Sequence, residues 1–264
     1  MTKALFQKEL SIAVKAAELA GKIQLHGQKK IRNIEIKNDK SPVTEIDKNC
    51  ENIIIETISR KFINDGFLGE ESGESGGRHE RRWIIDPLDG TRPYIRGLDT
   101  YSVLIALECG GKLVLGVIYL PAREQLFYAV SGFGAFCNKK PVNVSRTADY
   151  SAIFGSAFGF IENAHQPAAQ AVLDCMQGWD YSYGFMDALT YANIISGKTD
   201  VCINLCDRPW DCAAAACIVK EAGGKFSDLN GKETIYSGNI IISNGLVHDA
   251  VLQFFRPKKF HNNP

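Results

Sequence analysis

Four acidic residues lie in two short segments of the N-terminal half of the sequence. Glu70 and Glu71 follow one short apolar run, and Asp86 and Asp89 follow another. Both runs have the composition of strand ends, and open sheets tend to bind ligands just outside the carboxyl ends of their strands. Two carboxylates about 4 Å apart repel by roughly 4 kcal/mol at an effective dielectric constant near 20. The spacing therefore predicts that these side chains either point apart into water or surround a cation.

A hard divalent metal ion fits this acidic group better than zinc does, because all of its members are oxygen donors, which suit Mg²⁺ or Mn²⁺. Gly90 follows the last carboxylate and frees the backbone to turn. A helical turn that starts there would direct its free N–H groups at an anion. Carboxylates for a metal beside N–H groups for an anion predict a phosphate ester held by Mg²⁺. Two metals about 3.5–4 Å apart could clamp its attacking and leaving oxygens.

Ordinary turns are the alternative interpretation of the second acidic segment. Asp-Pro at 86–87 and Asp-Gly at 89–90 are common turn dipeptides, and Tyr101–Leu107 could be the next strand of a plain strand–loop–strand unit. Two further acidic segments, Gly69–Ser72 upstream and Pro209–Asp211 downstream, favour the metal site over this alternative, because the three segments together are far more specific than one turn motif.

These three segments resemble the signatures of the inositol monophosphatase family, a superfamily of Mg²⁺-dependent, lithium-sensitive phosphatases. The matching residues are Gly69-Glu70-Glu71-Ser72, Trp83-Ile84-Ile85-Asp86-Pro87-Leu88-Asp89-Gly90-Thr91 and Pro209-Trp210-Asp211. The similarity runs from about Lys37 to Gly224, most of the chain. It implies an α+β fold, a layered α-β-α-β-α sandwich with a mostly antiparallel N-terminal sheet and a smaller C-terminal α/β sheet.

The resemblance also implies which residues bind metal. Glu70, Asp86 and the carbonyl oxygen of Leu88 are expected to hold one Mg²⁺, and Asp86, Asp89 and Asp211 a second. The family binds two or three such ions per site, and Mn²⁺ could replace them. Taken alone, Asp211 could instead cap the helix that is expected to begin at or just after it.

Catalytic and phosphate-binding roles follow from the same resemblance. Thr91, hydrogen-bonded to Asp47, is expected to orient and deprotonate the attacking water, and Glu71 to support the first metal or its water. The backbone N–H groups of Gly90 and Thr91 would hold phosphate oxygens. Lys37 matches a family lysine near the metals. The sequence alone would make Asp47 a solvated acid in the first turn of a helix and Lys37 an exposed residue at a strand end.

The substrate-recognition positions depart from the inositol pattern. Asn204 and Tyr181 stand where inositol enzymes have Glu and Arg, and Gly184-Phe185-Met186 replaces a segment of small residues. Arg92 after Asp-Gly-Thr resembles the histidinol-phosphate phosphatase branch, whereas Pro-Trp-Asp resembles the inositol branch. Arg92 and Arg96 could equally be surface charges.

We therefore expect a phosphomonoesterase acting on inositol monophosphate or histidinol phosphate. Fructose 1,6-bisphosphate and adenosine 3′,5′-bisphosphate are further candidates. A catalytically silent protein that binds metal and a phosphorylated metabolite is the alternative from a different class. A complete set of metal ligands together with a water activator disfavours it, because a binding module has no need for a water activator.

Composition restricts the partners. The 264 residues carry 30 Lys or Arg and 30 Asp or Glu, so that the net charge of zero gives no attraction to nucleic acids or membranes. The charged N-terminus lacks a signal-peptide core and no apolar run reaches about 18 residues, which predicts a cytoplasmic protein. Eight scattered cysteines are expected to be reduced thiols. The expected partner is a small phosphate ester, and the family resemblance suggests a homodimer.

The expected elements divide the chain into an N-terminal α+β lobe at 1–145 and a C-terminal α/β lobe at 146–264, which supplies Asp211. A helix is expected over Leu5–Leu25 and a strand over Ile34–Lys37. A second helix should begin with Ser41 as N-cap and Pro42 at its first position. Further strands are expected over Tyr101–Glu108, Lys112–Tyr119, Gln125–Val130, Ile153–Ala157, Val201–Leu205, Lys225–Asp228 and Ile240–Ser243, and further helices over Gln166–Met176, Ala188–Ile195 and Ala213–Glu221.

Overall fold

The computed structural model describes residues 6–30, 34–36, 42–76, 80–161, 163–184 and 187–256. Its α-helices are α1 (Gln7–Gly27), α2 (Glu45–Ser59), α3 (Thr91–Ile95), α4 (Pro167–Met176), α5 (Asp187–Ile195), α6 (Pro209–Glu221) and α7 (His248–Leu252). No helix in these ranges is long and apolar enough to cross a membrane.

The larger sheet has eight strands in the order β10-β9-β8-β7-β6-β5-β3-β4. They are β3 (Gly66–Gly69), β4 (Gly73–Ser75), β5 (Arg81–Asp89), β6 (Ser102–Cys109), β7 (Lys112–Leu120), β8 (Gln125–Val130), β9 (Ala135–Cys137) and β10 (Lys140–Val142). Neighbouring strands are antiparallel except β3 and β5. The predicted meander from Tyr101 to Val130 is therefore confirmed as β6–β8. Its short loops leave an antiparallel return as the simplest connection.

The smaller sheet has five strands in the order β12-β11-β13-β15-β14. They are β11 (Phe154–Phe158), β12 (Tyr181–Ser182), β13 (Val201–Asn204), β14 (Lys225–Ser227) and β15 (Ile240–Ser243). β11 is parallel to β12 and β13, whereas β15 is antiparallel to β13 and β14. Each sheet draws its strands from one side of residue 145, and the proposed division into two lobes there stays a prediction.

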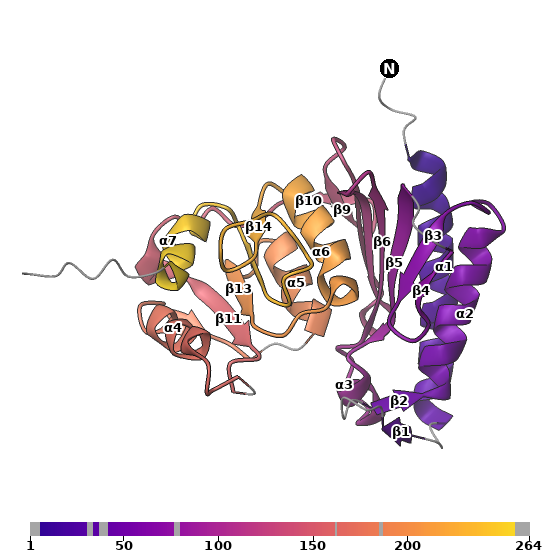
Figure 1. The fold of residues 1–264 in the computed structure, drawn as a ribbon, viewed down its shortest axis with the longest axis horizontal. Coiled ribbons are helices and arrows are strands. Elements are labelled where there is room, and N and C mark those ends of the chain that lie inside the picture. The colour runs from indigo at the N-terminus through magenta and orange to yellow at the C-terminus, as the bar shows by residue number, and fades with distance from the viewer. Residues whose placement is uncertain are drawn as a thin grey trace, which may run out of the picture.

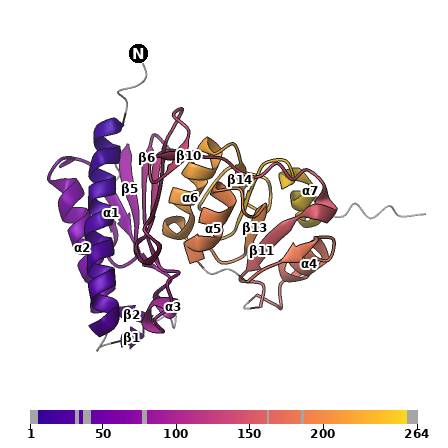
Figure 2. The same cartoon turned by 180° about the vertical axis from the view of Figure 1, so that it is seen from behind.

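Helices and sheets alternate in five layers (Figures 1 and 2). In order they are α1 with α2, the eight-stranded sheet, α5 with α6, the five-stranded sheet, and α4 with α7. This arrangement confirms the layered α+β sandwich. The Ala-rich α6 lies in the middle layer, and its close approach to the large sheet depends on Gly116, where an added Cβ would lie 2.5 Å from the Ala214 carbonyl oxygen. The two sheets therefore share one central helical layer.

The N-terminus of α2 differs from the sequence prediction. Pro42–Thr44 forms strand β2, which pairs with β1 (Ile34–Ile36), and the helix begins at Glu45. Thr44 is the N-cap, because its Oγ1 accepts a hydrogen bond from the Ile46 N–H at 3.1 Å. The prediction that Pro42 occupies the first helical position is wrong, since that residue pairs in a strand. Ser41 lies outside the described residues.

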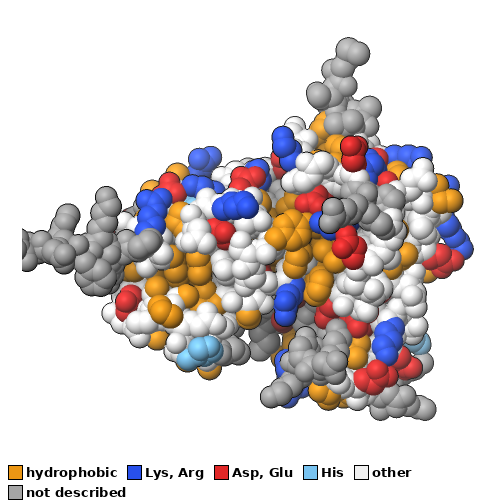
Figure 3. All heavy atoms as spheres, viewed as in Figure 1, with side chains coloured by type: hydrophobic (Ala, Val, Ile, Leu, Met, Phe, Trp, Pro, Cys, Tyr) orange, Lys and Arg blue, Asp and Glu red, His pale blue; other side chains and the backbone are white. Residues whose placement is uncertain are grey.

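Charged side chains of both signs are interspersed over the face of the molecule in Figure 3. The apolar residues gather in three buried clusters, one on each side of the larger sheet and one between the smaller sheet and the outer helices α4 and α7. The eight cysteines are all free thiols, and most are buried or half-buried. The layers are thus held by apolar packing rather than by disulfide bonds.

Candidate active site

A cavity of about 740 Å³ lies where the C-terminal ends of β5 and β13 meet the starts of α3, α5 and α6. Both sheets contribute to its walls. The predicted site residues that line it are Glu70, Asp86, Leu88, Asp89, Gly90, Thr91, Arg92, Asn204 and Asp211. Segments more than 100 residues apart in the sequence therefore meet in one hollow.

An irregularity in β5 directs two of the carboxylates into this cavity. The pairing of β5 with β6 shifts register between Asp86 and Asp89. Asp86 Oδ1 accepts a hydrogen bond from the Leu88 N–H at 3.0 Å, which closes a tight turn inside the strand. Gln24 on α1 donates to the Pro87 carbonyl oxygen at 2.8 Å and supports the turn from behind. A bulge of this kind re-aims side chains at the end of a strand.

The carboxylates in the cavity strongly disfavour one another's ionised forms. Burial raises the pKa of Asp86 well above its usual value, and the nearby carboxylates of Glu70, Asp89 and Asp211 raise it further. Burial, together with the negative charges of Asp207, Asp89 and Glu70, likewise raises the pKa of Asp211. A hydrogen bond with the Glu70 side chain also raises the pKa of Asp86, because two ionised carboxylates cannot share such a bond without a proton.

Asp211 enters the cavity from the first turn of α6. The helix begins at Pro209, two residues earlier than Asp211, so the prediction that Asp211 lies at or just before the helix start is wrong. Asp211 Oδ2 accepts a hydrogen bond from the Arg208 N–H at 2.7 Å. This contact is typical of an acid in the first helical turn. The same residue therefore supports the helix start and presents a carboxylate to the cavity.

The donor set fits a hard divalent cation. The acidic side chains that line the cavity are oxygen donors, they are largely buried, and their charges repel. Within the described ranges, no group of three or more Asp, Glu, His or Cys side chains is arranged so that it could hold a metal ion as it stands. The carboxylates therefore surround a shared space rather than a preformed cage. Oxygen ligands around such a space suit Mg²⁺, which keeps several waters and needs few protein ligands.

Thr91 begins α3 directly beside the carboxylates. Gly90 precedes it with a φ of 81°, a left-handed conformation that glycine adopts readily. Thr91 Oγ1 lies 3.0 Å from Asp47 Oδ1 and 3.1 Å from the Leu88 carbonyl oxygen. A hydroxyl group has one hydrogen to donate, so it can serve only one of these acceptors at a time. Its lone pairs can accept a hydrogen bond from a water molecule in the cavity.

Residues 6–258 match the model of the inositol monophosphatase family. The chain belongs to this family. The sequence similarity between this chain and its relatives in the inositol monophosphatase family extends over most of each protein. A histidinol-phosphatase of Chlorobaculum parvum is 41% identical over 246 residues, covering 89% of this chain and 91% of that protein.

Two further relatives carry other names. A fructose-1,6-bisphosphatase/inositol-1-monophosphatase of Thermotoga maritima is 33% identical over 248 residues, covering 92% of this chain and 94% of that protein. The solved structure of the extragenic suppressor protein SuhB from Bartonella henselae matches with a TM-score of 0.85 at 30% identity, covering 96% of this chain and all of that one. The family and these names show that the chain is a phosphatase, a hydrolase of phosphate esters.

Several residues that were predicted to belong to the site of this inositol monophosphatase family member do not line the cavity. Asp47 and Glu71 do not line the cavity, although Asp47 contacts Thr91. Tyr181 lies on the edge strand β12, 56% exposed, with its ring against that of Phe154. Gly184 also lies outside the lining. Lys37 and Phe185 fall outside the described residues.

Asn204 lines the cavity, and both ends of its side-chain amide contact other protein groups. Its amide nitrogen contacts Asp207 Oδ1, and its Oδ1 accepts a hydrogen bond from the Cys206 N–H at 3.1 Å. Tyr191 donates to Asp207 Oδ2 at 2.7 Å. Burial raises the pKa of Asp207 to about 7. Asn204 and Tyr191 therefore satisfy a buried carboxyl group in the cavity wall.

Asp187 is a cavity residue that the sequence prediction missed. It has a φ of 53°, which is uncommon outside glycine, and such strain often marks a functional site. Among the described residues, its buried Oδ2 has no hydrogen-bond partner. Burial raises its pKa to about 6. An Asp just before the helix expected at Ala188 would have been interpreted as an N-cap, so that only its position in the cavity reveals it.

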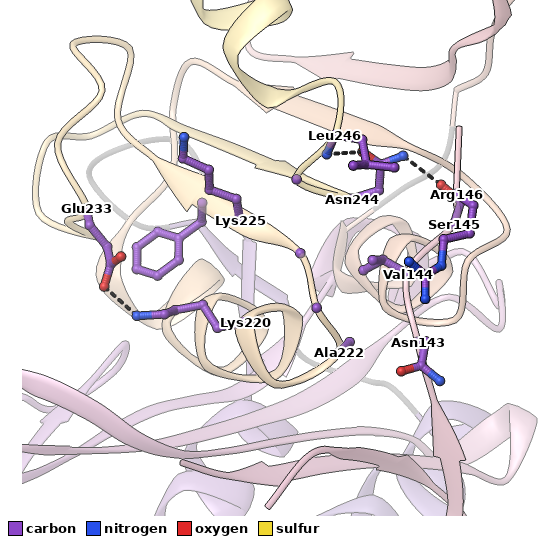
Figure 4. A pocket seen from close by; sticks show the side chains of 14 residues that line it. Asn143, Val144, Ser145, Arg146, Lys220, Ala222, Lys225, Glu233, Asn244 and Leu246 are labelled. Carbon is purple, nitrogen blue, oxygen red and sulfur yellow. Dashed lines mark hydrogen bonds and ion pairs between the residues drawn. The ribbon is translucent and has the colours of Figure 1, made fainter. Parts of the chain in front are cut away.

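A second cleft, of about 550 Å³, lies at the other end of α6 (Figure 4). There Lys220 is paired with Glu233 at 2.6 Å, and Asn244 donates to Ser145 at 2.8 Å. Asp211 in the carboxylate cavity and Lys220 in the second cleft are separated by roughly 13 Å along the axis of α6, so the two hollows are distinct. Because clustered acids with perturbed pKa values mark functional sites, the carboxylate cavity is the candidate active site of this phosphatase.

Proposed function

We propose that this phosphatase is a Mg²⁺-dependent phosphomonoesterase of small metabolites, with histidinol phosphate as its preferred substrate. The observation that carries the proposal is the convergence of Glu70, Asp86, Asp89 and Asp211 on one cavity beside Thr91. Buried acids in such an arrangement are stable when a hard cation lies among them, and a bound phosphate group then completes the neutralisation of charge.

Glu70, Asp86 and the Leu88 carbonyl oxygen would hold one Mg²⁺, and Asp86, Asp89 and Asp211 the other. The metals would supply Lewis-acid activation of water and neutralise the charge of the phosphate. Mn²⁺ is expected to substitute, and Li⁺ to inhibit, as in the family that the sequence resembles.

The protein's own part of the reaction centres on Thr91. When its hydroxyl hydrogen is donated to Asp47 Oδ1, a lone pair of Oγ1 is free to accept a hydrogen bond from the attacking water. That contact orients the water and offers its proton a path toward Asp47. Backbone N–H groups of Gly90 and Thr91 would hold phosphate oxygens. Inorganic phosphate is the expected product, without a covalent enzyme intermediate.

Two observations support a substrate that carries a positive charge. Asp187, in the cavity wall, supplies a carboxyl group whose buried Oδ2 has no hydrogen-bond partner among the described residues. An ammonium group would form a charge-assisted hydrogen bond with it, whereas a neutral polyol would form a weaker one. The relative from Chlorobaculum parvum is named a histidinol-phosphatase. Inositol monophosphate is the alternative substrate, and Arg92 and Arg96 in the cavity wall would suit the second phosphate of a bisphosphate.

Phosphate release from a substrate panel tests this proposal. The panel holds L-histidinol phosphate, myo-inositol 1-phosphate, fructose 1,6-bisphosphate and adenosine 3′,5′-bisphosphate, each with Mg²⁺, Mn²⁺ or EDTA and then with Li⁺. We expect the highest kcat/KM for histidinol phosphate and no turnover in EDTA. Binding of these esters without any phosphate release would instead indicate a silent binding protein.

Substitution Asp187→Asn should change specificity. Asn tolerates a positive φ, so the backbone is preserved while the charge is removed. A hydrogen bond to a charged group contributes about 1.5–3 kcal/mol, so kcat/KM for histidinol phosphate should fall roughly 10- to 100-fold, whereas that for inositol 1-phosphate should change little. Half-buried Asp174, on the outer helix α4 and outside the cavity lining, provides the control variant Asp174→Asn. An equal loss for both substrates would contradict the assigned role.

We also propose that the phosphatase is a homodimer, as the family resemblance suggests. Light scattering coupled to size exclusion chromatography measures this directly, and a mass near the monomer's 29.1 kDa at micromolar concentration would overturn it.

A further inference from the structure

Helix α2 carries two buried carboxylates one turn apart, on the side that faces the large sheet. Asp47 is 0% exposed and Glu51 is 3% exposed. Like charges four residues apart destabilise a helix unless other groups stabilise them. Asp47 accepts hydrogen bonds from the Thr44 N–H at 2.8 Å, from Thr44 Oγ1 at 2.6 Å and from Thr91 Oγ1 at 3.0 Å. Its charge therefore has a full set of donors, and Glu51 requires its own.

The donors to Glu51 come from the loop that carries Glu70. Glu51 Oε2 accepts the Glu71 N–H at 3.0 Å, and Oε1 accepts the Ser72 N–H at 2.8 Å. Both carboxylate oxygens are thus used on two consecutive backbone amides. Each bond to a charged acceptor is stronger than a neutral one. This pair of bonds ties residues 71 and 72 to α2.

Gly69 allows this close approach. A Cβ at position 69 would lie 2.5 Å from Glu51 Oε2 and 2.9 Å from Ser72 Oγ. Glu51 is buried and both of its carboxylate oxygens accept hydrogen bonds, so the carboxylate has little room to move away. On the other side, the Glu70 N–H donates to the Ile85 carbonyl oxygen at 3.2 Å on β5. Glu70 therefore lies between an anchor on the sheet and an anchor on the helix.

We propose that Glu51 is a positioning residue that fixes the conformation of residues 70–72, and thereby places Glu70 opposite Asp86 for metal binding. This inference rests on the proposed function for the use of the metal, and on the observed contacts for the geometry. Helix α2 then positions both the proposed water-binding hydroxyl of Thr91 and the loop that carries Glu70. Asp47 holds the hydroxyl of Thr91, and Glu51, one turn later, holds the loop of Glu70, so the two parts keep a set separation.

Glu51→Gln tests the proposal, because Gln has one acceptor oxygen for two amide donors and its NH₂ group would face an N–H. Outer contacts of this kind typically change metal affinity 10- to 100-fold. We expect the Mn²⁺ dissociation constant, measured by electron paramagnetic resonance without substrate, to rise about tenfold or more. The Mg²⁺ concentration for half-maximal activity should rise in parallel, while kcat at saturating Mg²⁺ stays close to that of the wild type.

A second variant and a matched control separate positioning from a loss of folding. Gly69→Ala keeps the carboxylate but displaces it, and should weaken Mn²⁺ binding in the same way. Glu56→Gln is the control, because Glu56 lies on the same helix with its side chain exposed and paired with Arg60. Thermal unfolding with and without Mn²⁺ reports the folded fraction. A purely structural role would lower the unfolding temperature and leave the Mn²⁺ affinity of the folded protein unchanged, which would overturn the proposal.

The outcomes also distinguish this inference from the proposed function. If the wild type binds Mn²⁺ but releases no phosphate from the panel, the proposed function fails and the Mn²⁺ titrations still decide the role of Glu51. Equal Mn²⁺ affinity in the wild type and in Glu51→Gln overturns the inference even if the phosphatase activity is as proposed. A wild type that binds no Mn²⁺ overturns both.

Discussion

Asp89→Asn is expected to reduce phosphate release by about 10³-fold, because it removes one of the carboxylate charges that would hold the second Mg²⁺. Such a charge contributes roughly 4 kcal/mol at 4 Å and an effective dielectric constant near 20, and each 1.36 kcal/mol of activation free energy is a factor of ten in rate. Asn keeps the shape of the side chain. One of its polar atoms can still meet Ser102 Oγ and the Ala188 N–H, which both lie 2.8 Å from Asp89 Oδ2.

The unfolding temperature of metal-free Asp89→Asn should not fall, although its activity should. Burial and the charge of Asp187 raise the pKa of Asp89 well above its usual value, so that the ionised side chain is unfavourable without a cation. In metal-free buffer the unfolding temperature of Asp89→Asn should therefore equal or exceed that of the wild type. Asp99→Asn is the matched control, because Asp99 is exposed and paired with Arg123 at 3.0 Å. Near-normal Mg²⁺-dependent activity of Asp89→Asn, in a protein that is fully folded, would contradict the assignment of Asp89 as a metal ligand.

Thr91→Ala is expected to lower kcat by about 10²-fold, within the range that a positioned proton acceptor contributes. The substitution removes the hydroxyl that contacts Asp47 Oδ1 and the Leu88 carbonyl oxygen, and leaves the carboxylates of the cavity in place. The Mg²⁺ concentration for half-maximal activity should therefore change by no more than about threefold. Thr91→Ser retains the hydroxyl and should recover most of the rate. Steady-state kinetics over a Mg²⁺ titration measures both quantities.

A different result would reassign Thr91. If Thr91→Ala mainly weakens metal binding and kcat recovers at high Mg²⁺, the hydroxyl supports the Leu88 carbonyl oxygen as a ligand rather than the water. If Thr91→Ser is as inactive as Thr91→Ala, the methyl group or the packing at the start of α3 matters more than the hydroxyl.

Much of the fold could be predicted because its signals are local. Alternating and continuous apolar runs with short glycine or proline loops predict β6–β8, and the Ala-rich run stopped by Gly223-Gly224 predicts α6. The start of α2 was misplaced, because Ser41-Pro42 and Thr44 offer competing capping chemistry and only strand pairing with β1 decides between them. The start of α6 was misplaced by a few residues relative to Asp211 for a related reason, since Pro209 is compatible both with a loop and with the first helical position.

The candidate site was predictable where carboxylates gather in short segments, and not where a single residue acts from a distance. The segments at 70–71, 86–89 and 211 are recognisable because several acids and glycines occur together. Asp187 and Glu51 stand alone, and each resembles an ordinary helical acid. Tyr181 and Gly184 were predicted to face the substrate from their alignment with family positions, whereas the structure has them outside the cavity lining, with Tyr181 on an exposed edge strand.

By itself, the sequence determined the types of layers and the acidic segments whose carboxylates line the cavity, since periodicity and residue chemistry are properties of short stretches. The tertiary structure alone decided which side chains share the cavity. The left-handed backbone at Asp187, the bulge in β5 and the two hydrogen bonds that Glu51 accepts from the 70–72 loop each depend on contacts between segments far apart in the chain. Such contacts exist only after the layers have packed.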